Sequence, residues 1–395
     1  MTEKEKPAHR SMQMDSLRAV ATVAVVALHA AGPFLYRFGT IAADEWWWAN
    51  LIDSAVRFSV PVFLMLTGAL LLPRTESTGV FLKRRFSRLL GPFIFWSLLY
   101  LSVALLFQPS GSTISSLDLA MHRLRSGTSF HLWYVYMLIG IYLFIPILQR
   151  WVAMASRRDL EYFIALWLLA LLASNHLPAS SFPDFNLMYF SGYIGYLVLG
   201  HYLQRYFFID PEKTSSDTNF LQTNNTGGQN HPWSDAIVKR RKWTIFVAAT
   251  MVGTGILITA IGTAWISKER GHFDQSFYEY LSFNVILMAT GAFLLAGTLS
   301  TLPRWIEKPV HLLSRYSYGI YLSHVMVLKL AAALQWDSML MKLFDNTVRV
   351  HEMGSNSATL HPSIGIPIVT VVTVIIALFI SIILNKLPFG KYISG

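Results

Sequence analysis

The 395-residue sequence contains no cysteine and few charged residues. Without cysteine the chain cannot form a disulfide, a thiolate metal site or a cysteine nucleophile, so any nucleophile must be oxygen or nitrogen. Charged residues make up 14% of the chain and hydrophobic residues 53%, whereas roughly a quarter of a typical soluble protein is charged. These proportions indicate a protein whose main solvent is lipid.

Long apolar runs recur along the whole sequence, and most approach the roughly 20 residues that cross a bilayer as a helix. The predicted spans are 16–36, 51–72, 88–107, 131–150, 160–174, 186–206, 244–266, 278–300, 312–334 and 364–385. The sequence therefore predicts an all-α, polytopic integral membrane protein with about ten transmembrane helices. We expect residues 1–395 to form a single transmembrane domain with no soluble domain.

The net charge of +10 could suggest nucleic acid as a partner, but an excess of Lys and Arg in a membrane protein marks cytoplasmic loops. Lys and Arg gather in alternate connections between the predicted spans. This pattern predicts that both termini are cytoplasmic, that the lipid bilayer surrounds the chain and that no nucleic acid binds. Residues 210–235 are rich in Ser, Thr, Asn and Gly, which predicts a disordered cytoplasmic loop.

Three ionisable side chains stand out inside the predicted spans, namely His29, Arg57 and His324. An ionised group costs at least about 2.5 kcal/mol at mid-depth, so each is a candidate functional residue. Their positions along their helices place them at similar depths, which favours one buried site. The alternative is that Arg57 snorkels to the interface and that the two histidines are satisfied by hydrogen bonds between helices.

The first span carries a polar stripe. Arg18 and His29 are eleven residues apart, and eleven steps of roughly 100° return to nearly the same helix face. Asp15, three residues before Arg18, belongs to this face too. The stripe could line a cavity that runs inward from the cytoplasm.

Basic residues precede and open the third span, at Lys83, Arg84, Arg85 and Arg88. They could act only as a topology signal. Arginine also binds phosphate through two parallel hydrogen bonds, so the same residues could hold an anionic nucleotide-type donor. These two interpretations are compatible.

Aromatic residues flank two spans on the predicted external side. They are Trp46 and Trp47 before the second span, and His131, Trp133 and Tyr134 at the start of the fourth. An interfacial aromatic belt explains them. Aromatic faces would also suit the apolar ring faces of a sugar chain, so all five are candidate substrate-binding residues.

Motifs spread over most of the chain resemble those of one family. They are Asp15, Leu17, Arg18 and His29; Arg57, Ser59, Val60, Pro61, Phe63, Thr67 and Gly68; Arg84, Arg85 and Arg88; His131, Leu132, Trp133, Tyr134, Tyr142 and Pro146; Tyr193, Gly195 and Gly200; and Ser317 to Leu322 with His324. In this order they resemble the acyltransferase 3 family of membrane O-acyltransferases. The similarity is greatest to the family's bacterial O-acetyltransferases of enterobacterial common antigen and exopolysaccharides.

The resemblance implies acyl transfer in the bacterial inner membrane. Acetyl-CoA would be the cytoplasmic co-substrate, with no metal, and a glycan hydroxyl on the extracytoplasmic side would be the acceptor. His29 would act as the base or form an acyl-imidazole. Arg57 would stabilise negative charge on the thioester oxygen, and His324 would orient His29 or relay its proton. The donor would be bound by residues Asp15, Arg18, Arg84, Arg85 and Arg88.

Two other functions stay open at this point. Buried polar groups in ten helices would equally suit a secondary transporter or a lipid-linked sugar flippase. Neither function needs arginines aligned with a deep histidine. A non-catalytic helper in a polysaccharide synthase complex is the third possibility, and it predicts that His29 can be replaced without effect.

Overall fold

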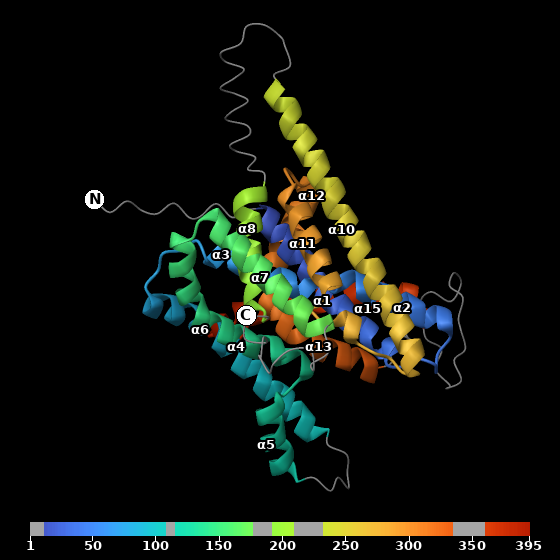
Figure 1. Cartoon of the computed structure of the whole chain (residues 1–395). Coiled ribbons are helices and arrows are strands. Elements are labelled where there is room, and N and C mark those ends of the chain that lie inside the picture. The colour runs from blue at the N-terminus through green and yellow to red at the C-terminus, as the bar shows by residue number, and fades with distance from the viewer. Residues whose placement is uncertain (1–11, 108–114, 177–191, 209–231, 335–359) are drawn as a thin grey trace. The chain divides into compact units, whose positions relative to one another are not determined.

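The computed structural model describes residues 12–107, 115–176, 192–208, 232–334 and 360–395, and these residues are helical with no β-strand among them (Figure 1). The helices in the first half of the chain are α1 (Met12–Leu35), α2 (Ala43–Val56), α3 (Ser59–Leu71), α4 (Thr78–Leu106), α5 (Ser116–Ser126), η1 (Phe130–Leu132), α6 (Trp133–Met154), α7 (Arg157–His176) and α8 (Ile194–Phe207). Those in the second half are α10 (Pro232–Arg270), η4 (Ser276–Tyr278), α11 (Phe283–Gly297), α12 (Arg304–Arg315), α13 (Ser317–Ala333), α15 (Pro362–Lys386) and η5 (Gly390–Tyr392).

Seven helical segments in the described part of the chain are long and apolar enough to cross a membrane. They are Met12–Leu35, Ala43–Leu71, Thr78–Leu106, Phe130–Met154, Val238–Arg270, Ser276–Gly297 and Pro362–Lys386. The prediction of an all-α, polytopic membrane protein is thereby supported. Helices α7, α8 and α13 coincide with the other predicted spans but are not among the seven. The number of ten spans and the cytoplasmic termini stay predictions.

The chain folds into two compact units. The first comprises Met1–Ala24, Asn50–Pro73 and Met154–Ser314, and the second comprises Val25–Ala49, Arg74–Ala153 and Arg315–Gly395. Two of the boundaries fall inside α1 and α2, so each of these helices contributes several residues to both units. This division into two units does not test the prediction of a single transmembrane domain.

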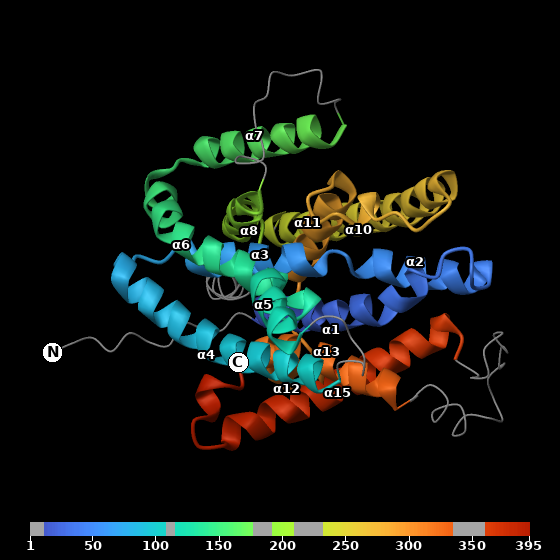
Figure 2. The same cartoon turned by 90° about the horizontal axis from the view of Figure 1, so that it is seen from below.

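In the first unit, α3 packs against α8 and α10 runs beside α11 (Figure 2). Glycines permit the close approach of α3 and α8, since a Cβ at Gly68 would overlap the backbone of Leu197 and one at Gly200 would overlap the backbone of Met65. Membrane helices associate through such small-residue contacts because lipid offers no hydrophobic driving force between them. The first turns of α10 extend beyond α11 (Figure 1).

In the second unit, α13 packs against α15 and α4. Gly319 of α13 allows the last residues of the chain to lie close, because a Cβ there would overlap the backbone oxygen of Ser394. The hydroxyl of Tyr318 donates a hydrogen bond of 2.9 Å to the Leu89 carbonyl of α4. These contacts hold α13 between α4 and the C-terminal segment.

The predicted second span is broken. The helix begins at Ala43, ends at Val56 and resumes at Ser59 as α3. Proline at position 61 explains the interruption, because its ring clashes with the carbonyl four residues earlier, which belongs to Arg57. Arg57 therefore lies at a helix break.

Two helices begin earlier along the chain than the predicted spans. The third span was predicted to begin at residue 88, whereas α4 begins at Thr78, directly after Ser77 in an extended N-cap conformation. Lys and Arg are good helix formers, so the helix continues past the apolar run. The predicted loop 210–235 ends at residue 231, because Pro232 begins α10 at the first helical position, where proline fits well. The rest of that predicted loop lies outside the described residues.

Candidate active site

Three histidines from separate elements of the second unit form one cluster. His29 lies on α1, His131 on η1 and His324 on α13. The ring centroids of His29 and His324 are 5.2 Å apart, with the planes inclined by 26°. His131 lies 5.2 Å from His324 and 6.4 Å from His29. The structure therefore brings His131, predicted to contact substrate, together with His29 and His324, predicted to act in catalysis.

The tautomer of His324 follows from its hydrogen bonds. Its Nδ1 lies 2.6 Å from the carbonyl oxygen of Tyr321 and 3.2 Å from that of Ile320. A carbonyl can only accept, so Nδ1 carries the proton and donates. The Nε2 atom then has a lone pair, and it is buried without a hydrogen-bond partner among the described residues. In a fully buried side chain, such a nitrogen is available to accept a hydrogen bond.

His131 is held by two contacts. Its Nδ1 lies 3.0 Å from the hydroxyl oxygen of Ser129, and its backbone carbonyl accepts a hydrogen bond from the hydroxyl of Tyr321. The residue is 1% exposed, and its Nε2 also has no hydrogen-bond partner in the described part of the chain. Two buried imidazole Nε2 atoms thus lie in one cluster without a hydrogen-bond partner among the described residues.

His29 is half-buried on α1. The centroid of its ring lies 5.1 Å from that of Phe130 in an edge-to-face arrangement. Proline at position 33, four residues on, has no N–H to donate to the His29 carbonyl, so the backbone helix hydrogen bond is missing at this point. His29 therefore differs from its two partners in being accessible from one side.

Arg57 lies in the first unit, and its described contacts are with residues of that unit. Its guanidinium forms an ion pair with Asp53, whose side chain is fully buried. The Arg57 Cζ atom lies 4.0 Å from the ring centroid of Tyr278, a distance typical of a cation–π contact. The Tyr278 hydroxyl donates a 2.6 Å hydrogen bond to Asn50 Oδ1, and Asn50 Nδ2 donates to the Ala260 carbonyl at 2.9 Å. A polar network thus surrounds the break between α2 and α3.

One continuous helix, α1, carries Asp15, Arg18 and His29 of the predicted polar stripe. Arg18 lies 3.8 Å from Asp15, and both contact Ser314 of α12. The Ser314 hydroxyl donates a 2.6 Å hydrogen bond to Asp15 Oδ1. Asp15 is buried and Arg18 is partly exposed, so the guanidinium remains accessible.

The predicted arginine cluster lies on α4 of the second unit. Arg84 and Arg88 are exposed, and Arg85 is partly buried with its Cζ atom 5.6 Å from the ring centroid of Phe81. Arg84 forms a 3.0 Å ion pair with Glu76. The Arg85 Nε atom is buried and has no hydrogen-bond partner among the described residues.

Residues 13–385 match the family model described as an acyltransferase domain, acyltransferase 3. The chain belongs to this family. Membership implies membrane acyltransferase activity, which neither a transporter nor a flippase would have. No curated protein and no solved structure matches the chain.

The aromatic residues that were predicted to be external divide into two groups. Trp46 is 4% exposed and donates a 3.1 Å hydrogen bond from Nε1 to the Leu35 carbonyl at the end of α1. Trp47 is 44% exposed and Trp133 is 38% exposed. Tyr134 lies with its ring centroid 5.6 Å from that of Tyr321, beside the histidine cluster. Trp46 thus joins α2 to α1, whereas Trp47, Trp133 and Tyr134 remain better candidates for contact with substrate.

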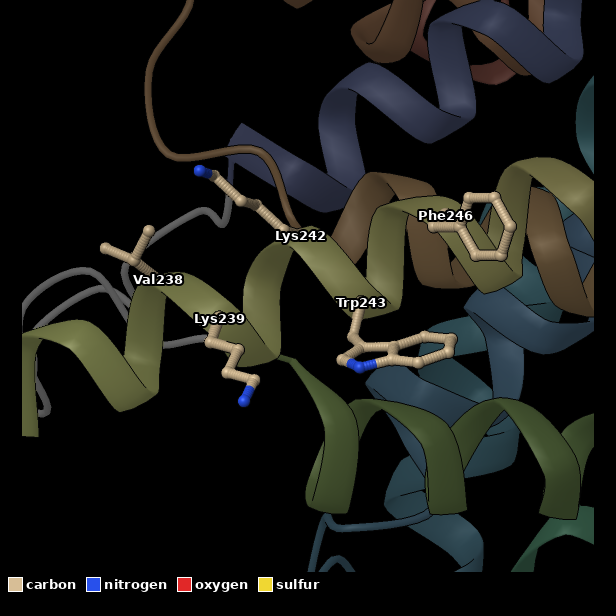
Figure 3. Close-up of a pocket in the computed structure, with 5 residues that line it drawn as sticks. All are labelled: Val238, Lys239, Lys242, Trp243 and Phe246. Atoms are coloured by element: carbon tan, nitrogen blue, oxygen red, sulfur yellow. The ribbon is translucent and has the colours of Figure 1, made fainter.

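A depression of about 460 Å³ lies on the first turns of α10 and is lined by Val238, Lys239, Lys242, Trp243 and Phe246 (Figure 3). It contains none of the predicted site residues. The histidine cluster and the arginines therefore remain the candidate site. Within the described residues, no group of three or more His, Asp or Glu is arranged to hold a metal ion.

Sequence reasoning missed three ionisable residues inside the predicted spans. Asp53 is the ion-pair partner of Arg57. The spacing of four residues between the two side chains could have revealed this pair in the sequence. Lys329 has its Nζ 5.7 Å from the ring centroid of Tyr100. His201 on α8 is 3% exposed, and neither ring nitrogen has a hydrogen-bond partner in the described part of the chain. The same cost of burying a charge that singled out His29 applies to Asp53, which is fully buried, whereas Lys329 is exposed.

Proposed function

We propose that this family member transfers an acetyl group from cytoplasmic acetyl-CoA to a hydroxyl of a bacterial surface glycan or exopolysaccharide. The supporting observation is the cluster of His29, His131 and His324, with a buried, unpartnered Nε2 on each of the last two among the described residues. The proposal places the chain in the bacterial inner membrane with the acceptor on the extracytoplasmic side. It is also compatible with assembly into a polysaccharide synthase complex.

The chemistry assigned to the cluster is general base catalysis. The oxygen of the acceptor hydroxyl attacks the thioester carbonyl carbon, so that a C–O bond forms and the C–S bond breaks. His29 takes the hydroxyl proton and returns it to the departing thiolate, which leaves the acetyl ester and the CoA thiol. Neutral imidazole suits this task because its ordinary pKa lies near the operating pH.

His324 and His131 support His29 in this proposal. The lone pair on His324 Nε2 is fixed by the two carbonyls that hold Nδ1–H, so the ring can receive a proton from the reacting groups. A variant of the mechanism forms an acyl-imidazole on His29 with loss of the CoA thiol, after which the acceptor hydroxyl attacks that acyl group.

Arg57 was predicted to stabilise negative charge on the thioester oxygen. Its contacts favour a different proposal. Asp53 already neutralises the guanidinium, and Tyr278 covers it at 4.0 Å. We therefore favour Arg57 as the residue that holds the break between α2 and α3.

The donor would be bound by basic residues at the predicted cytoplasmic side. Arg84, Arg85 and Arg88 would bind the CoA phosphates, and Arg18, held by Asp15, would contact the pantetheine arm or a phosphate. By helix rise, Arg18 and His29 are roughly 16 Å apart along α1. An extended pantetheine arm can bridge such a distance.

The test is mass analysis of surface polysaccharide from bacterial cells that lack this protein. Acyl esters should be lost in the null strain and restored by wild type or by the control His311→Ala, which alters an exposed histidine of α12. A well-expressed His29→Ala variant should restore none. Unchanged esters in the null strain would contradict the glycan acceptor, whereas full rescue by His29→Ala would contradict the mechanism.

A further inference from the structure

Glu76 forms ion pairs with two arginines at the start of α4. Its Oε2 lies 3.0 Å from Arg84 NH1, and its Oε1 lies 3.6 Å from Arg74 NH1. The two arginine side chains are 47% and 41% exposed, whereas that of Glu76 is only 14% exposed. One carboxylate thus occupies the space between two solvent-accessible guanidinium groups.

The surrounding stretch is strongly basic. Residues 73–90 contain five bases and one acid, namely Arg74, Lys83, Arg84, Arg85, Arg88 and Glu76. Arg84 and Arg88 are four residues apart and share a face of α4. Five cations repel one another, and a group with several negative oxygens would relieve this repulsion better than a single carboxylate.

We propose that Arg74 and Arg84 form a phosphate-binding site for CoA, and that Glu76 fills this site until a phosphate displaces it. The proposal rests on the proposed acetyl-CoA dependence. It adds Arg74 to the donor site and assigns Glu76 as a residue that lowers donor affinity by competition. Two carboxylate oxygens that bridge two guanidinium groups imitate two oxygens of a bound phosphate.

A purely structural role for Glu76 leads to the opposite expectation. If the carboxylate only ties Arg74 to α4, its removal would loosen the helix start and weaken donor binding. If Glu76 competes with phosphate, its removal frees both arginines and strengthens binding. The sign of the change in affinity therefore distinguishes the two roles.

The experiment measures CoA binding calorimetrically with the full chain in lipid nanodiscs. Glu76→Gln should tighten CoA binding roughly three- to ten-fold, because the competing carboxylate and a like charge beside the phosphate are both removed. The increase in CoA affinity should be smaller in high salt, since salt screens exposed charges. The matched control is Glu161→Gln, which removes a carboxylate paired with Arg157 at 2.8 Å on α7, and it should not change CoA affinity.

A second variant tests the arginine directly. Adding Arg74→Gln to Glu76→Gln should remove the gain and return the affinity to the wild-type value or below it. If wild type binds CoA but Glu76→Gln binds it equally or more weakly, the competition proposal is overturned and acetyl-CoA dependence stands. If wild type does not bind CoA, the donor assignment itself fails, and the role of Glu76 with it.

Discussion

The hydroxyl of Tyr100 accepts a hydrogen bond of 3.0 Å from the backbone N–H of Met326. The same hydroxyl donates a 2.9 Å hydrogen bond to the carbonyl of Leu322. Leu322 and Met326 are the carbonyl and N–H that would pair directly in an uninterrupted α-helix. Tyr100 of α4 is therefore inserted into the hydrogen-bond ladder of α13, over the turn that carries His324, and a side chain inserted in this way bends a helix locally.

Removing this hydroxyl should disturb the histidine cluster without unfolding the protein. In Tyr100→Phe the Leu322 carbonyl and the Met326 N–H can pair directly, so α13 should straighten and move His324. We expect about a ten-fold loss of acetyl transfer and a change in stability within about 1–2 kcal/mol, the range for one buried hydrogen bond. Activity and thermal unfolding in detergent check this. Tyr136→Phe, at an exposed tyrosine of α6, is the control, and equal activity of both variants would refute the prediction.

The role of Nε2 in His324 can be separated from that of Nδ1. In His324→Asn the amide N–H can still donate to the Tyr321 carbonyl, but the Nε2 lone pair is lost. We expect a fall in kcat of roughly 10²–10⁴-fold, the usual contribution of general acid–base catalysis, with nearly unchanged thermal stability. A variant that keeps wild-type kcat would show that the ring serves only as a hydrogen-bond donor within α13.

The pair formed by Asp53 and Arg57 should be strongly coupled. Asp53→Asn or Arg57→Gln alone leaves a buried charge without its partner, and we expect each to lower stability by about 3–5 kcal/mol. The double variant should be less destabilised than the sum of the two single changes. A double-mutant cycle on thermal unfolding measures this coupling. Additive losses would mean that the two side chains act independently.

The contact between α3 and α8 should not tolerate a methyl group at either glycine. Gly68→Ala and Gly200→Ala each place a Cβ into the backbone of the facing helix, so we expect losses of about 1–3 kcal/mol or more from overpacking. Gly140→Ala on α6 is the control, because a Cβ there would meet no atom within 4 Å. Thermal unfolding of the three variants in detergent provides the comparison, and a Gly68→Ala protein as stable as the control would contradict the packing.

Helix content and polar residues could be predicted from single segments. The apolar runs indicated the helices, because a span must be apolar over about 20 residues. Proline at position 61 could have predicted the break at Arg57, since the clash of a proline ring acts four residues back. The beginning of α4 at Thr78 could not be read from hydropathy, because a helix may continue through charged residues.

The grouping of site residues was only partly predictable. His29 and His324 were expected together because both lie deep in apolar segments, and the structure places their rings 5.2 Å apart. His131 was assigned to substrate binding because it stands at the start of an apolar run, where an interfacial position is the simplest interpretation. Its burial depends on the contact between Tyr321 and the His131 carbonyl, which joins segments 190 residues apart.

The sequence alone determined that this protein belongs in a membrane and that it resembles one acyltransferase family, and it singled out histidines and arginines as candidate site residues. These inferences were possible because burying an ionised group costs free energy, so an ionisable residue in an apolar run stands out in any sequence. Only the tertiary structure decided the partner of each residue: His131 with His324, Arg57 with Asp53 and Tyr278, and Glu76 with Arg74 and Arg84. The pairings of His131 with His324 and of Arg57 with Tyr278 depend on the packing of segments distant along the chain, which local periodicity does not encode. The partners of Glu76, and Asp53 as partner of Arg57, lie nearby in the sequence.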